Sequence, residues 1–361
     1  MEKNQIYVTY GKDPFEMTMK LLREIKLEEM VPAKGKIILK PNLVVAKPAS
    51  SGATTHSEMI AATIEYLQSR GYNDLLIAEG SWVGDDTDDA FRADGLNAVS
   101  RKYGVPTLNL KKDRFQEVTA QGISMQVSRT VMDCGFLISY PVIKGHCQTT
   151  FTCALKNMKG VLSDGSKRRF HSLGLHKPIA ALNTIKCADL VLADGICGDL
   201  DFEEGGNPVF AGRIAAARDS VLMDAFGASL LGFPLEDIPY IKMAESFGVG
   251  STDLSKADIR TVGDISAAPM PPASYRVREL ARHCVPDSAC SACYASLIHA
   301  LARMEEDRTL RNLKEKVYIG QGYRGKELDK IGVGNCCSKF RTHVPGCPPS
   351  AADILRVLQD L

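Results

Sequence analysis

The sequence predicts an α/β fold: a mostly parallel sheet with helices on both faces, followed by a small cysteine-rich, metal-binding region that is rich in helix. Short apolar runs alternate with amphipathic helical patterns through the first 260 residues, and this alternation is typical of βαβ units with parallel strands. The runs contain few polar residues, as expected of strands covered on both faces. The alternation stops at a proline-rich stretch, SAAPMPPAS, at residues 266–274, which predicts a linker.

Five apolar runs are expected to form the strands of the sheet. They are residues 5–10, 36–40, 74–80, 134–141 and 189–195. Two of the patterns between the strands predict helices with clear ends. In the first, Thr55 and Glu58 have the spacing of a capping box and Gly71 stands where the helix would end. The second helix is expected at residues 219–232.

On this pattern the chain of 361 residues divides into an α/β domain at 1–265, a linker at 266–275 and a cysteine-rich iron–sulfur region at 276–361. The net charge of +1 gives no global attraction to nucleic acid or to a membrane surface. The N-terminus is polar, and no run approaches the about 18 apolar residues of a membrane span. We therefore expect a cytoplasmic protein with neither nucleic acid nor membrane as a partner. In that compartment eleven cysteines indicate metal or redox chemistry.

The C-terminal region contains six of the eleven cysteines. Cys290 and Cys293 form a C-x2-C pair, whose two thiolates can face one metal centre from a single turn of the chain. Cys336 and Cys347 are expected to supply the other two ligands. Cys284 and Cys337 are surplus, and each could replace a neighbour as a ligand or remain a free thiol.

Four thiolates suit either a 4Fe-4S cluster or zinc, and three details favour the cluster. Pro348 follows Cys347, as is common after the last cysteine of a cluster motif. Ser350 begins a terminal helix with Asp353 three residues later, so free amides face the thiolate side. The gap of 42 residues between the C-x2-C pair and the third ligand is long for a compact zinc site. We expect a four-iron, four-sulfur cluster, with structural zinc as the alternative.

A second concentration of chemistry follows the strand at 134–141. Between Lys144 and Lys177 the chain has seven Lys or Arg residues, one acidic residue and three of its seven histidines. The segment should emerge at the carboxyl edge of the sheet, where open α/β folds bind ligands. Lysine and histidine at such an edge suit a carboxylate or phosphate group. The alternative is a solvated basic loop whose histidines are structural.

Catalytic and binding roles follow from this placement. His146 or His171 is expected to be the acid or base, with Lys156 and Lys159 stabilising developing negative charge. Further substrate-binding groups are expected at strand ends and at a helix N-terminus of the same edge. They are Lys40, Asn42, Thr55, His56, Glu79, Lys144, Asn157 and Asp194.

Together these motifs resemble a known family. The segments KPNLV, GATTH and EGS, the ALKNMKG block with the downstream His171, ADG, and the terminal GNC and GCPPSAADIL are similar to the family catalogued as domain of unknown function 362, often described as iron–sulfur centre proteins. The resemblance covers residues 5–360 and implies an α/β domain with a cysteine-bound four-iron cluster. Many relatives have four closely spaced cysteines, whereas the cysteines here are dispersed. A fainter similarity in architecture links the chain to the N-terminal domain of lactate racemase-like proteins.

Two classes of function follow. The first is an enzyme that acts on a small anionic substrate by redox, sulfur-transfer or Lewis-acid chemistry at the cluster, as an oxidoreductase, lyase or sulfur transferase. A ferredoxin-like electron donor is a candidate partner. The second is a non-catalytic electron carrier or redox sensor. It would dock a partner through the excess positive charge between Arg276 and Arg341, where 13 residues are basic and 8 are acidic. An enzyme predicts a basic pocket within reach of the cluster, and a carrier predicts a cluster near the surface and far from that pocket.

Overall fold

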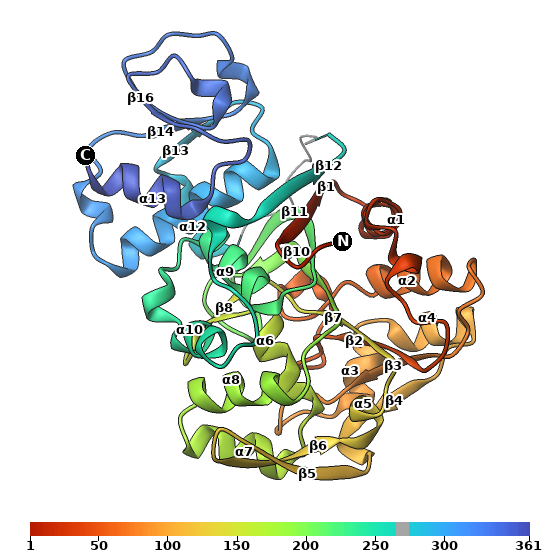
Figure 1. The fold of residues 1–361 in the computed structure, drawn as a ribbon. Coiled ribbons are helices and arrows are strands. Elements are labelled where there is room, and N and C mark those ends of the chain that lie inside the picture. Colours follow the sequence, from red (N-terminus) through yellow and green to blue (C-terminus); the bar gives the residue numbers. More distant parts are fainter. Residues whose placement is uncertain (265–273) are drawn as a thin grey trace.

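The computed structural model of the protein describes residues 1–264 and 274–361. Its body is an eight-stranded sheet in the order β12-β1-β11-β10-β7-β2-β3-β4 (Figure 1). Neighbouring strands are parallel except in the two pairs made by β11, so the prediction of a mostly parallel sheet is confirmed. The strands are β1 (Gln5–Tyr10), β2 (Ile37–Pro41), β3 (Leu75–Glu79), β4 (Thr107–Asn109), β7 (Phe136–Tyr140), β10 (Leu190–Asp199), β11 (Pro208–Ala217) and β12 (Asp258–Val262).

Helices cover both faces of this sheet, as the sequence predicts. Alternate strand residues enter two separate cores: Ile37 and Leu39 enter one, and Ile38 enters the other. The first core is closed by α1 (Pro14–Ile25), α2 (Ser57–Gln68), α3 (Thr87–Ala93) and α4 (Leu96–Tyr103). The second is closed by α5 (Arg129–Met132), α6 (Ala154–Asn157), α7 (Asp164–Ser172), α8 (His176–Ile185), α9 (Ser220–Leu231) and α10 (Pro239–Ser246).

All five runs predicted as strands are strands. The last of them, β10, extends further than predicted because it pairs with β11 in a long hairpin. The helix predicted at 219–232 is α9, which Asp219 and Gly232 cap. The predicted cap of α2 is wrong, since the helix begins at Ser57 and Thr55 has another role. Its hydroxyl donates to the Tyr140 carbonyl at 2.6 Å and accepts from the Asn42 amide at 2.8 Å, which ties the end of β2 to the end of β7.

The connection from β7 to α8 is ordered, and it forms much of the candidate site. It contains the hairpin of β8 (Lys144–His146) and β9 (Thr150–Thr152), then α6, the 3-10 helix η4 (Met158–Val161) and α7. A second hairpin, β5 (Phe115–Ala120) and β6 (Ile123–Ser128), precedes it. The other 3-10 helices are η1 (Leu27–Glu29), η2 (Ala49–Ser51), η3 (Leu110–Lys112), η5 (Leu235–Asp237), η6 (Leu254–Lys256), η7 (Leu310–Asn312), η8 (Gln321–Tyr323) and η9 (Asn335–Cys337).

The C-terminal region has a sheet of its own, and its hydrophobic core also includes Leu200, Val209 and Ala211 from the β10–β11 segment. Four strands of three residues form a parallel sheet, which the sequence patterns did not predict because each strand is so short. They are β13 (Cys284–Pro286), β14 (Val317–Ile319), β15 (Ile331–Val333) and β16 (Thr342–Val344). The region also contains α11 (Tyr275–Ala281), α12 (Ser291–Glu306) and α13 (Ala351–Gln359). Helix α12 packs against β11 and α9 (Figure 1).

The terminal helix begins as predicted, with the Ser350 hydroxyl accepting from the Asp353 amide at 3.1 Å. The linker predicted at 266–275 lies outside the described residues except for Ser274, which caps α11, and Tyr275, its first residue. Among the helices of the described residues, none combines the length and the apolar character that crossing a membrane requires.

Candidate functional site

A cavity of about 600 Å³ lies at the carboxyl edge of the sheet. Residues from the ends of β2 and β3, the β8–β9 hairpin, the α6–α7 segment and the loop between β10 and β11 line it. They are Asn42, Leu43, Val44, Glu79, Gly80, Ser81, Trp82, Val83, Gly84, His146, Cys147, Gln148, Lys156, Asn157, Lys159, Gly160, Lys167, Arg168, His171, Phe202, Glu203, Glu204 and Gly205. We call this cavity the basic pocket. The carboxyl edge is where open α/β sheets bind their ligands.

A buried ion pair supports one wall of the basic pocket. The ammonium of Lys40, at the end of β2, pairs with the carboxylate of Glu79, at the end of β3. Burial lowers the pKa of Lys40 and raises that of Glu79, and the attraction between the two opposes both shifts. Gly160 is required beside this pair, because a Cβ there would lie 1.8 Å from Glu79 Oε1. Glu79 therefore faces the cavity while Lys40 lies behind it.

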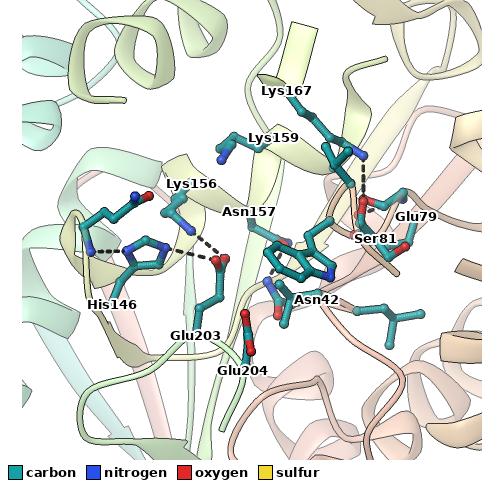
Figure 2. A pocket seen from close by; sticks show the side chains of 18 of the residues that line it. Asn42, Glu79, Ser81, His146, Lys156, Asn157, Lys159, Lys167, Glu203 and Glu204 are labelled. Atoms are coloured by element: carbon teal, nitrogen blue, oxygen red, sulfur yellow. Dashed lines mark hydrogen bonds and ion pairs between the residues drawn. The ribbon is translucent and has the colours of Figure 1, made fainter. Parts of the chain in front are cut away.

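A chain of amide hydrogen bonds supports the floor. Asn42 Nδ2 donates to Asn157 Oδ1 at 3.0 Å (Figure 2). Asn157 Nδ2 in turn donates to Ser139 Oγ at 2.9 Å. Below them Lys144 donates to Asn42 Oδ1 at 3.1 Å and to the Glu203 carbonyl at 2.8 Å. Because burial outweighs the attraction of Glu203, the pKa of Lys144 falls to about 7.

His146 holds a glutamate rather than presenting a free nitrogen to the cavity. Its Nδ1 accepts from the amides of Gln148 and Thr149 at 2.9 and 3.1 Å, so the ring proton is on Nε2, which donates to Glu203 Oε2 at 3.0 Å (Figure 2). Burial and the charge of Lys156 lower the pKa of His146 to about 4. Lys156 donates to the other carboxylate oxygen of Glu203 at 2.5 Å. Burial opposes ionisation of Glu203, but Lys156 and His146 hold its pKa well below the usual range.

Lys159 and His171 form a second pair, with Lys159 Nζ 3.4 Å from His171 Nε2. No carboxylate among the described residues pairs with Lys159. Burial and the neighbouring charge of Lys156 lower the pKa of Lys159 to about 7. Burial and Lys159 also lower the pKa of His171. Both groups therefore lose their proton more readily than they would in water.

Two further cations complete the basic pocket. Lys167 donates to the carbonyls of Gly80 and Ser81 at 3.0 and 2.8 Å, and Asp164 lies 3.6 Å away. Burial lowers the pKa of Lys167 to about 8. Arg168 is exposed and has no hydrogen-bond or ion-pair partner in the described part of the chain. Figure 2 shows Lys159 between Lys156 and Lys167 on the same side of the cavity.

Of the twelve residues predicted from sequence to bind or transform the substrate, seven line the basic pocket: Asn42, Glu79, His146, Lys156, Asn157, Lys159 and His171. Lys40 and Lys144 lie directly behind this lining. Thr55 holds two strands together, as described above. His56 and Asp194 bind each other, with His56 Nδ1 2.8 Å from Asp194 Oδ2, and neither contributes to the lining.

Sequence reasoning did not select Glu203, Lys167 or Arg168. Lys167 and Arg168 belong to the basic segment from which the site was predicted. A count of charges alone does not show which residues of that segment face the cavity. Glu203 is in DFEEGG, an acidic loop at 201–206. It reaches the site only because β10 and β11 form a hairpin whose turn extends over the pocket, a pairing that has no local sequence signal.

The four predicted metal ligands come together at a different place. Cys290, Cys293, Cys336 and Cys347 all line one cavity of about 60 Å³, which we call the cysteine cavity. The surplus cysteines, Cys284 and Cys337, do not line it. Within the residues that the structure describes, no three His, Cys, Asp or Glu side chains converge closely enough to hold a single metal ion.

The surroundings of the cysteine cavity suit an anionic group. Gln321 Nε2 donates to Cys290 Sγ at 3.3 Å, and Arg324 Nη2 lies 3.8 Å from Cys336 Sγ. Hydrogen bonds from Cys293 and Gln321 lower the pKa of Cys290. Arg213 is 2% exposed, and its Nη1 has no hydrogen-bond partner among the described residues. Because a buried guanidinium is costly without a counter-charge, negative charge among the nearby thiolates would stabilise Arg213.

The basic pocket and the cysteine cavity share no lining residue, and two geometric estimates place them on the order of 20 Å apart. Helix α12 starts beside Cys290 and reaches Arg303, which together with His146 lines a small cavity next to the basic pocket. Thirteen residues separate Cys290 from Arg303, which corresponds to about 20 Å of helix. The sheet gives a similar value, since the cysteine cavity lies near the end of β1, four strands from β2, at about 4.8 Å per strand. A small ligand in the basic pocket therefore does not touch the cysteine cavity.

The largely parallel sheet, with a polar pocket at its carboxyl edge, places the protein in the α/β class. The chain belongs to the family called domain of unknown function DUF362, whose model matches residues 37–229. That span contains the whole lining of the basic pocket and none of the four cysteines of the cysteine cavity.

Other similarities are more distant. A protein of Synechocystis described as thylakoid-associated is 23% identical over 231 residues, covering 60% of this chain and 69% of the relative. The lactate racemase apoprotein of Thermoanaerobacterium thermosaccharolyticum aligns with a TM-score of 0.44 and 11% identity, over 64% of this chain and 58% of that one. A Thermotoga maritima protein aligns with a TM-score of 0.38 and 14% identity, over 66% and 60% of the two chains. The chain thus spans about three fifths of each solved structure. Structural similarity this weak gives no information on function. The cytoplasmic location stays a prediction.

Proposed function

We propose that the protein is an enzyme that binds a small carboxylate or phosphate compound in the basic pocket and moves a proton on it. One observation carries the proposal: Lys159, which pairs with no carboxylate of the described residues, lies 3.4 Å from His171 in a cavity of about 600 Å³. A lysine whose pKa is near neutral is suited to acid–base catalysis, because both of its protonation states are populated at working pH.

The surrounding residues have separate tasks in this proposal. Lys167 and Arg168 supply positive potential for the anionic group, and Asn157 is an orienting amide. Glu203 fixes Lys156, and His146 orients Glu203, so His146 is a positioning residue here rather than the acid or base. His171 is exposed and can pass a proton between Lys159 and solvent. A bound anion favours the charged form of Lys159, and in that form Lys159 would be the acid. The neutral form of Lys159 would be the base.

We further propose that Cys290, Cys293, Cys336 and Cys347 hold a four-iron, four-sulfur cluster. The absence of a single-ion arrangement among the described residues supports this over zinc, since the sulfurs of a tetrahedral zinc site lie about 3.8 Å apart and a cluster holds each thiolate on a different iron. When bound, such a cluster supplies one-electron transfer. The separation of about 20 Å argues against Lewis-acid or sulfur-transfer chemistry of the cluster on a ligand in the basic pocket, because both need contact with the substrate.

An electron carrier is the second candidate function. It is favoured by the separation of the two cavities, which share no lining residue and so have the arrangement expected of a carrier, and by the exposure of Cys347, which would place a cluster close to the surface where a partner protein could approach. In that case the basic pocket would have no role in turnover.

Anion binding at the basic pocket is tested by calorimetric titration with inorganic phosphate and with succinate. Lys159→Met should weaken binding at least about tenfold, equivalent to about 1.4 kcal/mol, because it removes a partly buried charge from the site. Lys177→Met is the matched control, since Lys177 is exposed and belongs to the same basic segment but does not line the cavity. Equal affinity in the Lys159 variant and the wild type would refute the proposal.

The cluster is tested by measuring iron, zinc and acid-labile sulfide in protein purified without oxygen. About four irons and four sulfides per chain, with visible absorption that bleaches on reduction, are expected. Cys290→Ser and Cys347→Ser should lose iron, whereas Cys284→Ser should retain it. One zinc per chain without sulfide would support the alternative metal.

A further inference from the structure

We propose that the ligand of the basic pocket is a phosphate ester of a flat ring, with the phosphate among the lysines and the ring between Trp82 and Phe202 at the rim. This inference rests on the proposed function and narrows its substrate class. Three observations carry it: the size of the cavity, the number of unpaired cations, and two exposed aromatic side chains on rigid backbone at the same cavity.

The cavity is too large for a minimal anion. A volume of about 600 Å³ is within the range of pockets that enclose drug-sized ligands. A lone phosphate or a two-carbon acid would leave most of that volume to water. The ligand should therefore have a body in addition to its anionic group.

The cations indicate a dianion. Lys156 and Lys40 are neutralised by Glu203 and Glu79. Three cations of the lining remain without close neutralisation: Lys159 and Arg168 have no acidic partner among the described residues, and Lys167 has only Asp164 at 3.6 Å. Against these three stands one lining carboxylate, Glu204, that forms no ion pair among the described residues, so the excess is positive. A phosphate monoester carries nearly two negative charges at neutral pH and accepts several hydrogen bonds, so it matches this set better than a single carboxylate does.

Two aromatic side chains line the same cavity although they are half exposed, Trp82 at 47% and Phe202 at 50%. The backbone of Trp82 is held on both sides, with its amide donating to the Val44 carbonyl at 3.2 Å and its carbonyl accepting from Lys111 Nζ at 2.8 Å. The indole lies over Gly84, where a Cβ would be 2.9 Å from indole Cζ2.

Phe202 is held in a similar way. Asp199 is fully buried, and its Oδ1 accepts from the amides of Asp201 and Phe202 at 2.8 and 2.6 Å. Its Oδ2 accepts from the amide of Asn207 on the far side of the loop at 2.5 Å. Aromatic groups on fixed backbone lose little entropy when a ligand stacks on them, and stacking on a flat ring is a recurrent use of such exposed side chains.

The test uses the fact that Trp82 is the only tryptophan of the chain, so intrinsic indole fluorescence reports on this rim alone. The full-length protein is titrated with methyl phosphate, cyclohexyl phosphate and phenyl phosphate. Phenyl phosphate should bind at least about tenfold more tightly than methyl phosphate and change the fluorescence, with cyclohexyl phosphate between them.

Trp82→Ala and Phe202→Ala, followed by calorimetry, should each remove most of the preference for phenyl phosphate and leave the affinity for methyl phosphate within about twofold. Tyr275→Ala is the control, because Tyr275 is 72% exposed and lies outside the cavity. Equal binding of the three esters, or an unchanged preference in both rim variants, would overturn the inference while leaving the proposed function intact. Failure of every ester, inorganic phosphate and succinate to bind would overturn both.

Discussion

Gly160 offers a direct test of how the wall of the basic pocket is built. A Cβ at this position would lie 1.8 Å from Glu79 Oε1, 2.8 Å from Glu79 Cδ and 2.9 Å from Lys40 Nζ. Ordinary contacts to a Cβ begin near 3.4 Å, so Gly160→Ala forces the carboxylate to move by about 1.5 Å. Lys40 is fully buried and cannot follow toward solvent.

Two kinds of substitution set the range expected for the loss of stability in Gly160→Ala. Overpacking a core position costs about 1–3 kcal/mol, and removing one member of a buried ion pair costs about 3–5 kcal/mol. Because the alanine variant strains the pair without deleting it, we expect the free energy of unfolding to fall by about 2–4 kcal/mol. The displaced Glu79 would also enter the cavity and weaken phosphate binding by charge repulsion.

Urea denaturation of the purified variant measures the first effect, and calorimetric titration with phosphate measures the second. Gly165→Ala is the matched control five residues away, since its Cβ would meet nothing closer than Ser163 Oγ at 3.9 Å. Gly165 is in helix α7, so alanine there should be neutral or stabilising by up to about 1 kcal/mol. A Gly160→Ala variant within about 0.5 kcal/mol of wild type would refute the described packing of Glu79 and Lys40.

Three further outcomes are expected. Sulfate, which keeps its two negative charges throughout, should bind less tightly as the pH rises from 6 to 9, because Lys159 and Lys144, with pKa values of about 7, lose the charge that the anion needs; sulfate affinity that is flat or rising over this range in calorimetric titrations would contradict the assignment. Glu203→Gln should strengthen phosphate binding by about twofold to tenfold, because it leaves the ammonium of Lys156 without its carboxylate partner; weaker binding would contradict this assignment of Glu203. Arg213→Met should lower the iron content, because it removes the buried charge beside the cysteine cavity, whereas the exposed control Arg311→Met should retain full iron; equal iron in both variants would remove Arg213 from the cluster environment.

The central sheet was predictable because its strands carry the information locally. Runs such as DLLIAEG are short, apolar and bounded by turn residues, and a strand buried on both faces requires that composition. The strands of the C-terminal sheet are three residues long, too short for any periodicity to appear. Their pairing depends on contacts between segments that are far apart in the sequence.

The candidate site was predictable to the extent that strand order determines it. Asn42 and Glu79 follow adjacent parallel strands, so the rule for carboxyl edges brings them together without further information. The same rule included His56 and Asp194, which bind each other and do not line the cavity. Glu203 was missed because only the β10–β11 hairpin brings it over the pocket.

The cysteines show a different limit. Their spacing identified four residues that the fold gathers around one cavity, although 42 residues separate the second from the third. The spacing of the cysteines did not predict that this cavity is about 20 Å from the basic pocket, since that distance depends on the length and direction of α12. The expectation that the substrate reacts in direct contact with the cluster therefore had no support from the spacing of the residues.

The most direct test of the account is to locate a bound anion. Crystals soaked in tungstate, which resembles phosphate and scatters anomalously, should show their strongest anomalous peak inside the basic pocket, in contact with Lys159 and Arg168. Tungstate bound only at exposed lysines elsewhere, with none in the pocket, would contradict the central claim that this cavity is an anion site.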